Sequence, residues 1–375
     1  MIKPDAYNCC GCGVCAEACG HSAIEMKKDE LGFKIARVNE DRCIDCSLCD
    51  RICPFINNRC DNPNPVAYAA RHKNIEEVRR SRSGAIFVAL SDYILENNGA
   101  IYGAGFGSNF VVTHKRADSG EIRDTFRGSK YAQSDMTGIY SLIKKDLRDG
   151  IPVLFSGTPC QVSAVNNYIP DSIKDKLYTI DIICHGVASP RVWKEFIDYI
   201  KKKEHIKLIT VNFRDKNIFG WSGLHRESFV FSKNKVKTYP FTFYKSFLIR
   251  ESCSRCPFTS LKRQGDVTLG DFWGWNNTIP DFVNDDLGVS LILSNTAKGT
   301  MLLEEVKKDL NLRRIKLTDV LQPNLQYPTS RDPRSDEFKR DYANYGFNYV
   351  RKKYWKASFV QRVKTRIKNL LREFK

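Results

Sequence analysis

The chain has 375 residues, a mass of 43.0 kDa and a formal net charge of +17, which together predict two or three domains with a sizeable core. Its fourteen cysteines, without a secretory signal, favour a reducing compartment over a disulfide scaffold. Because no run of about 18 apolar residues occurs, the sequence excludes a membrane-spanning helix, and we expect a cytoplasmic protein. A basic surface suits an acidic protein partner, an anionic lipid surface or a phosphorylated substrate. No nucleic acid partner is expected, since no binding module is recognisable.

Two cysteine runs dominate residues 1–60. They read Cys9-x2-Cys12-x2-Cys15-x3-Cys19 and Cys43-x2-Cys46-x2-Cys49-x3-Cys53. Each is the bacterial ferredoxin pattern for a [4Fe–4S] cluster, in which the last cysteine of a run binds the other cluster. The sequence therefore predicts a two-cluster ferredoxin-like domain, with clusters held by Cys9, Cys12, Cys15 and Cys53 and by Cys43, Cys46, Cys49 and Cys19. Zinc is the alternative, and Cys10 and Cys60 are interpreted as packing residues.

The next segments predict a larger mixed α/β domain. Residues 23–38 are typical of a hairpin around Gly32, and 61–65 of a linker. Beyond it, strands are expected at 66–70, 101–106, 110–114, 153–155, 178–184 and 208–213, and helices at 83–99, 135–148 and 190–203. This order favours a mixed sheet with helices on both faces over residues 66–330. Residues 331–375 are expected to form a basic helical tail.

Four further cysteines lie in this larger domain: Cys160, Cys184, Cys253 and Cys256. The first two each follow an expected strand, and sites assemble at strand ends in open α/β sheets. The last two have the CxxC spacing of metal ligands. Four thiols suffice for a third [4Fe–4S] cluster, but zinc, plain packing and a nucleophile pair of Cys160 with His185 stay open.

Five short stretches carry a resemblance to a known family. They are Arg127-Gly-Ser-Lys-Tyr131, Gly157-Thr-Pro-Cys-Gln161, Asp181-Ile-Ile-Cys-His-Gly186, Cys253-x2-Cys256 and Gly270-Asp-Phe-Trp-Gly274. With these, residues 66–330 resemble the beta subunits of coenzyme F420 hydrogenases and dehydrogenases, which are iron–sulfur flavoproteins. The resemblance implies that Cys160, Cys184, Cys253 and Cys256 hold a third cluster beside FAD. It further implies a bacterial protein of the type associated with polysaccharide biosynthesis.

Eight residues are candidates for flavin contacts. Ser83 and Gly84 open a helix whose N-terminus suits a pyrophosphate, although the family usually has a second glycine where Ala85 stands. Arg127, Gly128, Ser129 and Lys130 offer cations and a flexible backbone, unless they form a basic solvated turn. Gly157 and Thr158 would bring backbone against the ring, or form an ordinary turn with Thr158 as N-cap. His185 and Asp271 adjoin family motifs, but no catalytic residue is assigned.

The last 25 residues, 351–375, hold ten basic residues and one acidic residue. Apolar residues recur among them near helical spacing, which indicates a basic amphipathic helix. Such a helix would lie on an anionic membrane surface, dock on a partner or fold onto the body. The first alternative would give peripheral contact with the inner face of the membrane.

Together these features favour an iron–sulfur flavoprotein oxidoreductase. A ferredoxin or another acidic carrier would exchange electrons with the clusters, and FAD would reduce or oxidise a small-molecule substrate. The resemblance suggests a glycan or nucleotide-sugar intermediate, or coenzyme F420, as that substrate. The alternative is a non-catalytic electron-transfer subunit of a larger redox complex.

Overall fold

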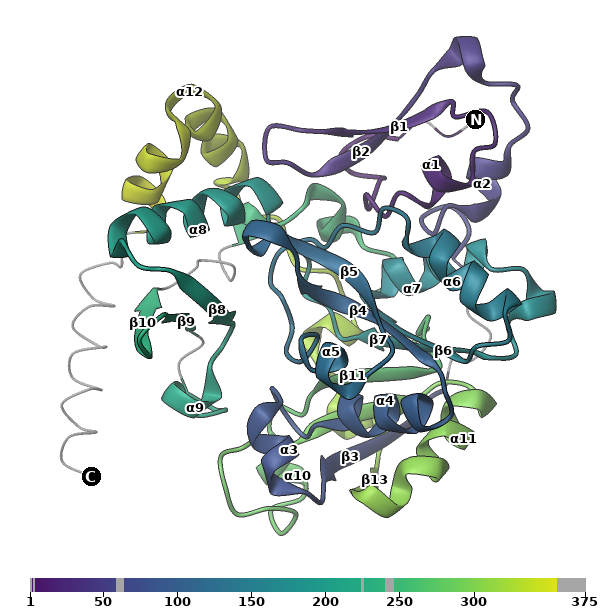
Figure 1. Ribbon diagram of the computed structural model, residues 1–375, viewed down its shortest axis with the longest axis vertical. Helices are drawn as coiled ribbons and strands as arrows, with labels where there is room; N and C mark the ends of the chain where they lie inside the picture. The colour runs from purple at the N-terminus through teal and green to yellow at the C-terminus, as the bar shows by residue number, and fades with distance from the viewer. Residues whose placement is uncertain (1, 3, 59–63, 224–225, 240–245, 356–375) are drawn as a thin grey trace.

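The computed structural model describes residues 2, 4–58, 64–223, 226–239 and 246–355 (Figure 1). This described part contains an eight-stranded sheet, a three-stranded sheet and a separate hairpin. No helix within it is long and apolar enough to cross a membrane.

The eight-stranded sheet is mixed. Its spatial order is β13-β3-β12-β11-β7-β6-β4-β5, with β4, β6, β7 and β11 parallel and the other pairs antiparallel. The strands are β3 (Val66–His72), β4 (Ala100–Phe106), β5 (Val112–Ala117), β6 (Val153–Gly157), β7 (Leu177–Ile182), β11 (Val267–Asp271), β12 (Ser290–Ser294) and β13 (Leu310–Ile315). Because the carboxyl ends of parallel strands meet at one edge, the residues after β6, β7 and β11 converge there.

Helices cover both faces of this sheet. α4 (Ile86–Glu96) and α11 (Ala297–Val306) pack on one face, and α6 (Ile139–Arg148) and α7 (Pro159–Tyr168) on the other. Successive residues of a strand point to opposite faces. Leu154 of β6 accordingly lies in the core under α4 and α11, whereas Val153 and Phe155 lie in the core under α6 and α7.

The smaller sheet is antiparallel and is formed by β8 (Leu208–Asn212), β9 (Glu227–Phe231) and β10 (Lys235–Tyr239). α8 (Pro190–Glu204) lies between it and α12 (Ser335–Tyr354), and aromatic side chains of all three parts share one core (Figure 1). Short helices complete the body: α3 (Ile75–Arg80), α5 (Gly120–Asp124), α9 (Lys216–Phe219), α10 (Trp275–Thr278), η2 (Ser108–Phe110), η3 (Asp171–Ile173), η4 (Ser246–Leu248), η5 (Glu251–Arg255), η6 (Lys307–Asp309), η7 (Leu317–Val320) and η8 (Pro323–Leu325).

The N-terminal head consists of α1 (Val14–Ala18), β1 (Ile24–Lys28), β2 (Lys34–Val38), η1 (Glu40–Arg42) and α2 (Leu48–Ile52). It packs directly on the body, because Cys10, Cys12, Val14 and Ile52 are buried in the same core as α6 and α7. The Tyr140 hydroxyl of α6 also donates to the Cys12 carbonyl oxygen at 2.9 Å. Head and body therefore share a buried interface.

The ferredoxin-like head and the larger mixed α/β body are confirmed. The hairpin turns around Gly32, whose φ of 81° is left-handed. The expected strand at 208–213 forms as β8, but in the three-stranded sheet instead of the main one. β11 and β12, in the middle of the main sheet, were not predicted. Residues 61–63 of the proposed linker and 356–375 of the tail lie outside the described residues, whereas α12 ends at Tyr354, which is buried.

Candidate functional site

Four cysteines from the two runs meet in the head. Cys9 and Cys12 lie close enough to Cys15 and Cys53 to affect the ionisation of these two thiols. Burial raises the pKa of Cys53 to about 11, and Cys12 and Cys9 raise it further. Burial likewise raises the pKa of Cys15, with contributions from Cys12, Cys9 and Cys53. Crowded thiols resist ionisation unless positive charge is present, and cluster iron supplies that charge. These four are the ligands predicted for one head cluster.

A second group lies beside the first. Cys19, Cys43, Cys46 and Cys49 line a cavity of about 40 Å³, and Cys15 of the first group lines it too. The Cys19 sulfur accepts a hydrogen bond from the Ala23 backbone N–H at 3.4 Å. The second predicted set of head ligands is therefore gathered at one place and adjoins the first.

The third group is in the body. Cys160, Cys184, Cys253 and Cys256 line a cavity of about 40 Å³. Burial and the neighbouring cysteines raise the pKa of each of the last three to about 12. Within the described part of the chain, no three His, Cys, Asp or Glu side chains gather closely enough to hold a single metal ion. The donor set, four soft thiols brought together by the fold, fits an iron–sulfur cluster.

Cys10, interpreted from sequence as a packing residue, joins the head to this cavity. It is buried and lines the cavity of the four body cysteines. Its thiol hydrogen-bonds with those of Cys12 and Cys160, and the bond with Cys10 is the first cause that lowers the pKa of Cys160 to about 7. Thr158 adds a contact of 3.2 Å between its Oγ1 and the Cys160 sulfur. One head group and the body group are thus separated by a single side chain.

A buried ion pair fixes the loops that carry two of the body cysteines. Arg263 donates to Asp181 at 2.9 Å, and both side chains are at most 1% exposed. Asp181 also accepts from the backbone N–H groups of Gln264 and Gly265. Asp181 lies in β7, three residues before Cys184, and the loop that Arg263 holds begins just after Cys256.

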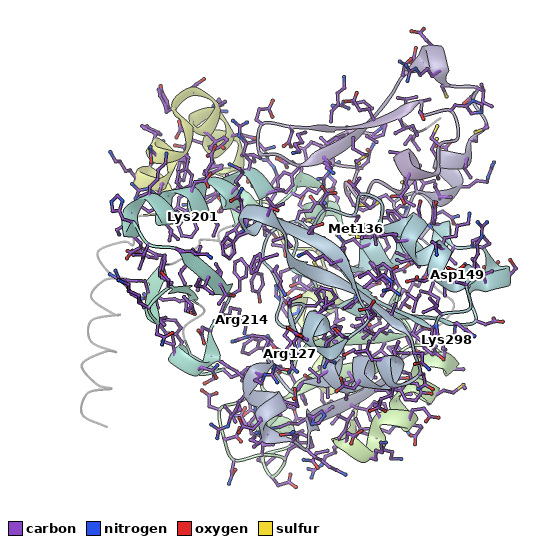
Figure 2. All side chains as sticks on the ribbon, viewed as in Figure 1. Arg127, Met136, Asp149, Lys201, Arg214 and Lys298 are labelled. Carbon is purple, nitrogen blue, oxygen red and sulfur yellow. The ribbon has the colours of Figure 1, made fainter. Side chains whose placement is uncertain are left out.

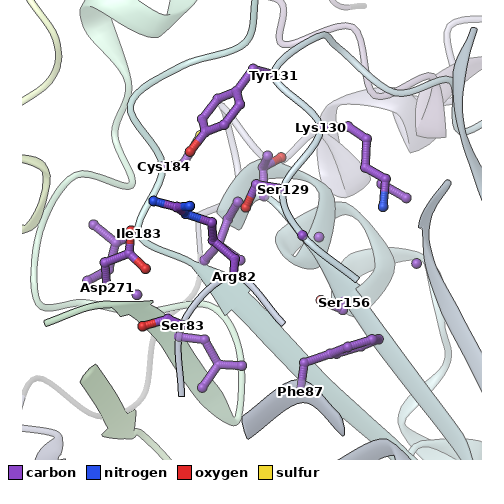
Figure 3. Close-up of a pocket in the computed structure, with 18 of the residues that line it drawn as sticks. Arg82, Ser83, Phe87, Ser129, Lys130, Tyr131, Ser156, Ile183, Cys184 and Asp271 are labelled. Atoms are coloured by element: carbon purple, nitrogen blue, oxygen red, sulfur yellow. The ribbon is translucent and has the colours of Figure 1, made fainter. Parts of the chain in front are cut away.

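A larger cavity, of about 490 Å³, lies at the carboxyl ends of β6, β7 and β11. Its volume is typical of small-molecule sites. Figure 3 shows its walls, with Tyr131 at one end and Phe87 at the other, and with Cys184 and Asp271 along one side. Cys184 and Thr158 line this cavity and the cavity of the body cysteines alike.

Seven of the eight predicted flavin residues line the larger cavity: Ser83, Arg127, Gly128, Ser129, Lys130, Gly157 and Thr158. Gly84 is the exception, since its N–H donates to the Ser290 hydroxyl at 2.9 Å and a side chain there would meet the Ala70 carbonyl oxygen. The N-terminus of α4 faces the cavity instead through Ala85, Ile86 and Phe87.

The structure refines the roles of two of these residues. The Arg127 guanidinium pairs with Glu77 and Asp124, so that both carboxylates offset its charge. Thr158 is the N-cap of α7, with its N–H donating to Gln161 Oε1 at 3.0 Å, and also lines the cavity. Thr158 is therefore both the N-cap of α7 and a lining residue of the larger cavity, and its contact with a flavin stays a prediction.

Ala85 has a φ of 65°, a left-handed conformation that costs a residue with a side chain about 1–2 kcal/mol. Glycine adopts it freely but loses about 0.5–1 kcal/mol through chain entropy. We expect Ala85→Gly to raise the free energy of unfolding by about 0.5–1 kcal/mol in denaturant titrations. Ala89→Gly, inside the same helix, is the control and should lower it by about 1 kcal/mol. A loss with both variants would contradict strain at Ala85.

His185 and Asp271 both line the larger cavity. Burial lowers the pKa of His185, and the Arg214 cation lowers it further. Arg214 donates to Asp271 Oδ2 at 2.7 Å and to the Tyr131 hydroxyl at 3.1 Å. Its guanidinium also lies 5.0 Å from the ring centre of Trp273. The structure thus brings together His185 and Asp271, the two groups that the sequence singled out. Arg214, which the sequence did not single out, affects both.

Sequence reasoning missed Arg214 and Trp273 as cavity residues. Arg214 belongs to residues 213–221, a turn to which the sequence assigns no role, and Trp273 belongs to the family motif Gly270–Gly274, in which Asp271 is the residue singled out. The two segments meet because Trp221 stacks on Trp273 with ring centres 4.6 Å apart. This contact joins residues that are far apart in the sequence, so the sequence did not predict it. The family motif around Asp271 was the signal that could have pointed to Trp273 as a cavity residue.

Arg250 ties the head to the body. This guanidinium, 3% exposed, donates to the Cys9 and Lys34 carbonyl oxygens at 2.9 and 2.7 Å and to Gln133 Oε1 at 3.0 Å. We expect Arg250→Met to lower the free energy of unfolding by about 3 kcal/mol, because three partly buried acceptors lose their buried, charged donor. Chemical denaturation would measure it. The exposed Arg255, changed to Met, should cost about 0.5 kcal/mol or less; equal effects would contradict the role given to Arg250.

Comparisons with known proteins match two parts of the chain. Residues 152–319 match the family described as the C terminus of the coenzyme F420 hydrogenase/dehydrogenase beta subunit, and residues 8–57 match the 4Fe-4S dicluster domain. Ferredoxin-3 from Nostoc sp. (strain PCC 7120) is 32% identical over 76 residues, which cover 16% of this chain and 75% of that protein. A chain in a solved structure of the F420-reducing [NiFe] hydrogenase complex from Methanosarcina barkeri is 17% identical with a TM-score of 0.47, and the match covers 77% of this chain and 90% of that one.

The dicluster match and the gathered cysteines identify the head as a 4Fe-4S cluster-binding unit. The family match covers the strands and loops that carry Cys160, Cys184, Cys253 and Cys256. The chain is therefore an iron–sulfur protein related to the beta subunits of the coenzyme F420 hydrogenase/dehydrogenase family.

Proposed function

We propose that this protein is an iron–sulfur flavoprotein oxidoreductase. It exchanges electrons with a ferredoxin or another acidic carrier through two head clusters, passes them through a third cluster at Cys160, Cys184, Cys253 and Cys256, and reduces or oxidises a small molecule at FAD. Its substrate would be a glycan or nucleotide-sugar intermediate, or coenzyme F420.

One observation carries this proposal: the four candidate sites form a continuous series in which each adjoins the next. Cys15 belongs to one head group and lines the cavity of the other. Cys10 contacts Cys12 and Cys160, and Cys184 lines both the body-cysteine cavity and the larger cavity. Electron transfer requires such proximity, whereas a structural zinc site would not.

The lining of the larger cavity supports the proposed flavin site. The N-terminus of α4 would hold the pyrophosphate, because its first N–H groups have no partner within the helix and its dipole favours negative charge. Gly157 and Thr158 would bring backbone against the ring at the end next to Cys184. When bound, the flavin would supply the exchange between one-electron and two-electron chemistry, while the protein fixes its position and excludes water.

Anaerobic purification with iron and flavin analysis tests the proposal. We expect flavin and about 12 irons per chain, since each cluster contains four. Reduced ferredoxin should bleach the flavin absorbance, and a panel of oxidants that includes coenzyme F420 should restore it. Iron at about 8 per chain would leave the head clusters alone. Absence of flavin would overturn the enzyme and favour an electron-transfer subunit.

A further inference from the structure

A second cavity, of about 130 Å³, adjoins the larger one at the junction with the three-stranded sheet. We refer to it as the side cavity. It shares seven lining residues with the larger cavity, among them Arg82, Lys130 and Arg214. Ala85, Ile86 and Phe87, at the N-terminus of α4, line the larger cavity only. The place proposed for the flavin pyrophosphate therefore lies outside the side cavity, whereas four of the predicted flavin contacts, Arg127, Gly128, Ser129 and Lys130, line both cavities.

The lining of the side cavity is strongly basic. It includes one acidic residue, Asp215, and seven basic ones: Arg79, Arg80, Arg82, Arg127, Lys130, Arg214 and Lys216. Glu77 and Asp124 offset Arg80 and Arg127, and Asp271 offsets Arg214. In the described part of the chain, these carboxylates form no ion pair with the two lysines, Lys130 and Lys216.

Lys130 and Lys216 are held by neutral oxygens. Lys216 is 6% exposed and donates to the Val78 and Leu287 carbonyl oxygens at 2.6 and 2.7 Å. Lys130 donates to two carbonyl oxygens of its own loop, each at 3.0 Å. In the described part of the chain, neither ammonium forms an ion pair with a carboxylate. Burial of the Lys216 ammonium is costly. The Asp271 and Asp285 charges offset part of that cost without forming an ion pair with it, and an anion in the side cavity would offset more.

We propose that the side cavity binds a phosphate or diphosphate group of the small-molecule substrate. This inference rests on the proposed function and gives its substrate a chemical class, a phosphorylated molecule. The rest of that molecule would extend into the larger cavity past Arg214, which lines both cavities, toward Trp273, which lines the larger one. Arginines and lysines are the usual partners of phosphate, the former through paired donors and the latter as point charges.

Binding should also depend on pH. Burial lowers the pKa of Lys130 to about 7, and the Lys115 charge lowers it further. Burial also lowers the pKa of Lys216 to about 7, and the Arg82 and Arg71 charges contribute to this shift. An anion favours the protonated lysines, so binding takes up protons. Affinity should therefore be highest below pH 7 and fall as the pH rises above it.

Isothermal titration of inorganic pyrophosphate into the full chain, loaded with clusters and flavin, tests the inference. Lys216→Gln, which keeps a hydrogen-bond donor but removes the charge, should weaken binding about tenfold or more, as expected for the loss of one charged contact. Lys298→Gln is the matched control: Lys298 also donates to two carbonyl oxygens, at 2.9 and 3.0 Å, but lies far from Arg127 and Arg214 (Figure 2). It should leave affinity unchanged.

Arg79→Gln, at an exposed rim position, should weaken binding severalfold without affecting folding. The affinity for pyrophosphate is measured against pH for Lys216→Gln and for the unmodified chain. The difference between the two profiles cancels the effect of the protonation of pyrophosphate itself. No binding to the unmodified chain, or equal losses with Lys216→Gln and Lys298→Gln, would overturn the inference. Loss of flavin in Lys216→Gln but not in Lys298→Gln would also overturn the inference, because the side cavity would then belong to the cofactor site. A flavin-free unmodified chain would instead overturn the proposed function, and pyrophosphate binding could still be measured.

Discussion

Replacing Cys160 with alanine is expected to lower the iron content from about 12 to about 8 per chain, because four-iron clusters are lost whole when a ligand is removed. Cys160 is the thiol of the body group that contacts Cys10, and it lies in the first turn of α7. The positive end of that helix dipole and its bond to Thr158 both favour the thiolate, the form that binds iron. Anaerobic iron analysis and electron paramagnetic resonance of the reduced protein would measure the loss.

Cys10→Ala is the matched control for Cys160→Ala. Both cysteines line the same cavity, but Cys10 is not among the proposed ligands. Iron should remain at about 12 per chain in Cys10→Ala. If Cys10→Ala lost four irons while Cys160→Ala kept them, the assignment of ligands would be wrong. Flavin bleaching by reduced ferredoxin should persist in Cys10→Ala and fail in Cys160→Ala. The reason is that Cys160→Ala removes the proposed body cluster, which lies between the head clusters and the larger cavity.

The local parts of this molecule could be predicted from the sequence because their information is local. The spacing of the cysteine runs encodes the head, and left-handed residues in the loops, such as Gly11 at φ 68° and Ser47 at φ 56°, let each run turn tightly. Strong apolar strands and helix ends encode β3 to β7, α4 and α8 within a few residues. These elements could be predicted without knowing which other elements pack against them.

The missed parts depend on contacts distant in sequence. β11 and β12 fill the centre of the main sheet, and β12 pairs antiparallel with β3, more than 200 residues away along the chain. Cys10 has no motif that marks it, yet it lies between two cysteine groups because the head docks on α6 and α7. The sequence offers Arg127 as a free cation for a phosphate, because its partner Glu77 comes from α3, far earlier in the chain. Its other partner, Asp124, is only three residues away and could have been anticipated.

Removing the Asp181 carboxylate should have the largest effect on stability. Asp181→Ala leaves Arg263 buried and without its counter-charge, which typically costs about 3–5 kcal/mol in free energy of unfolding. The backbone N–H groups of Gln264 and Gly265 lose their acceptor as well. Because Cys184 and Cys256 flank the two segments that this ion pair joins, we expect the proposed body cluster to be released at lower denaturant concentration than the head clusters.

The surface pair of Arg313 and Asp281 is the matched control for this effect. Arg313 likewise donates two hydrogen bonds to its carboxylate partner, at 2.7 and 2.9 Å, but both side chains of this pair are exposed. Asp281→Ala should therefore cost less than about 1 kcal/mol, since solvent screens an exposed pair. Denaturant titrations that follow cluster absorbance and far-ultraviolet circular dichroism together would separate release of the cluster from global unfolding. Similar losses in Asp181→Ala and Asp281→Ala would show that the buried pair does not anchor the cysteine loops.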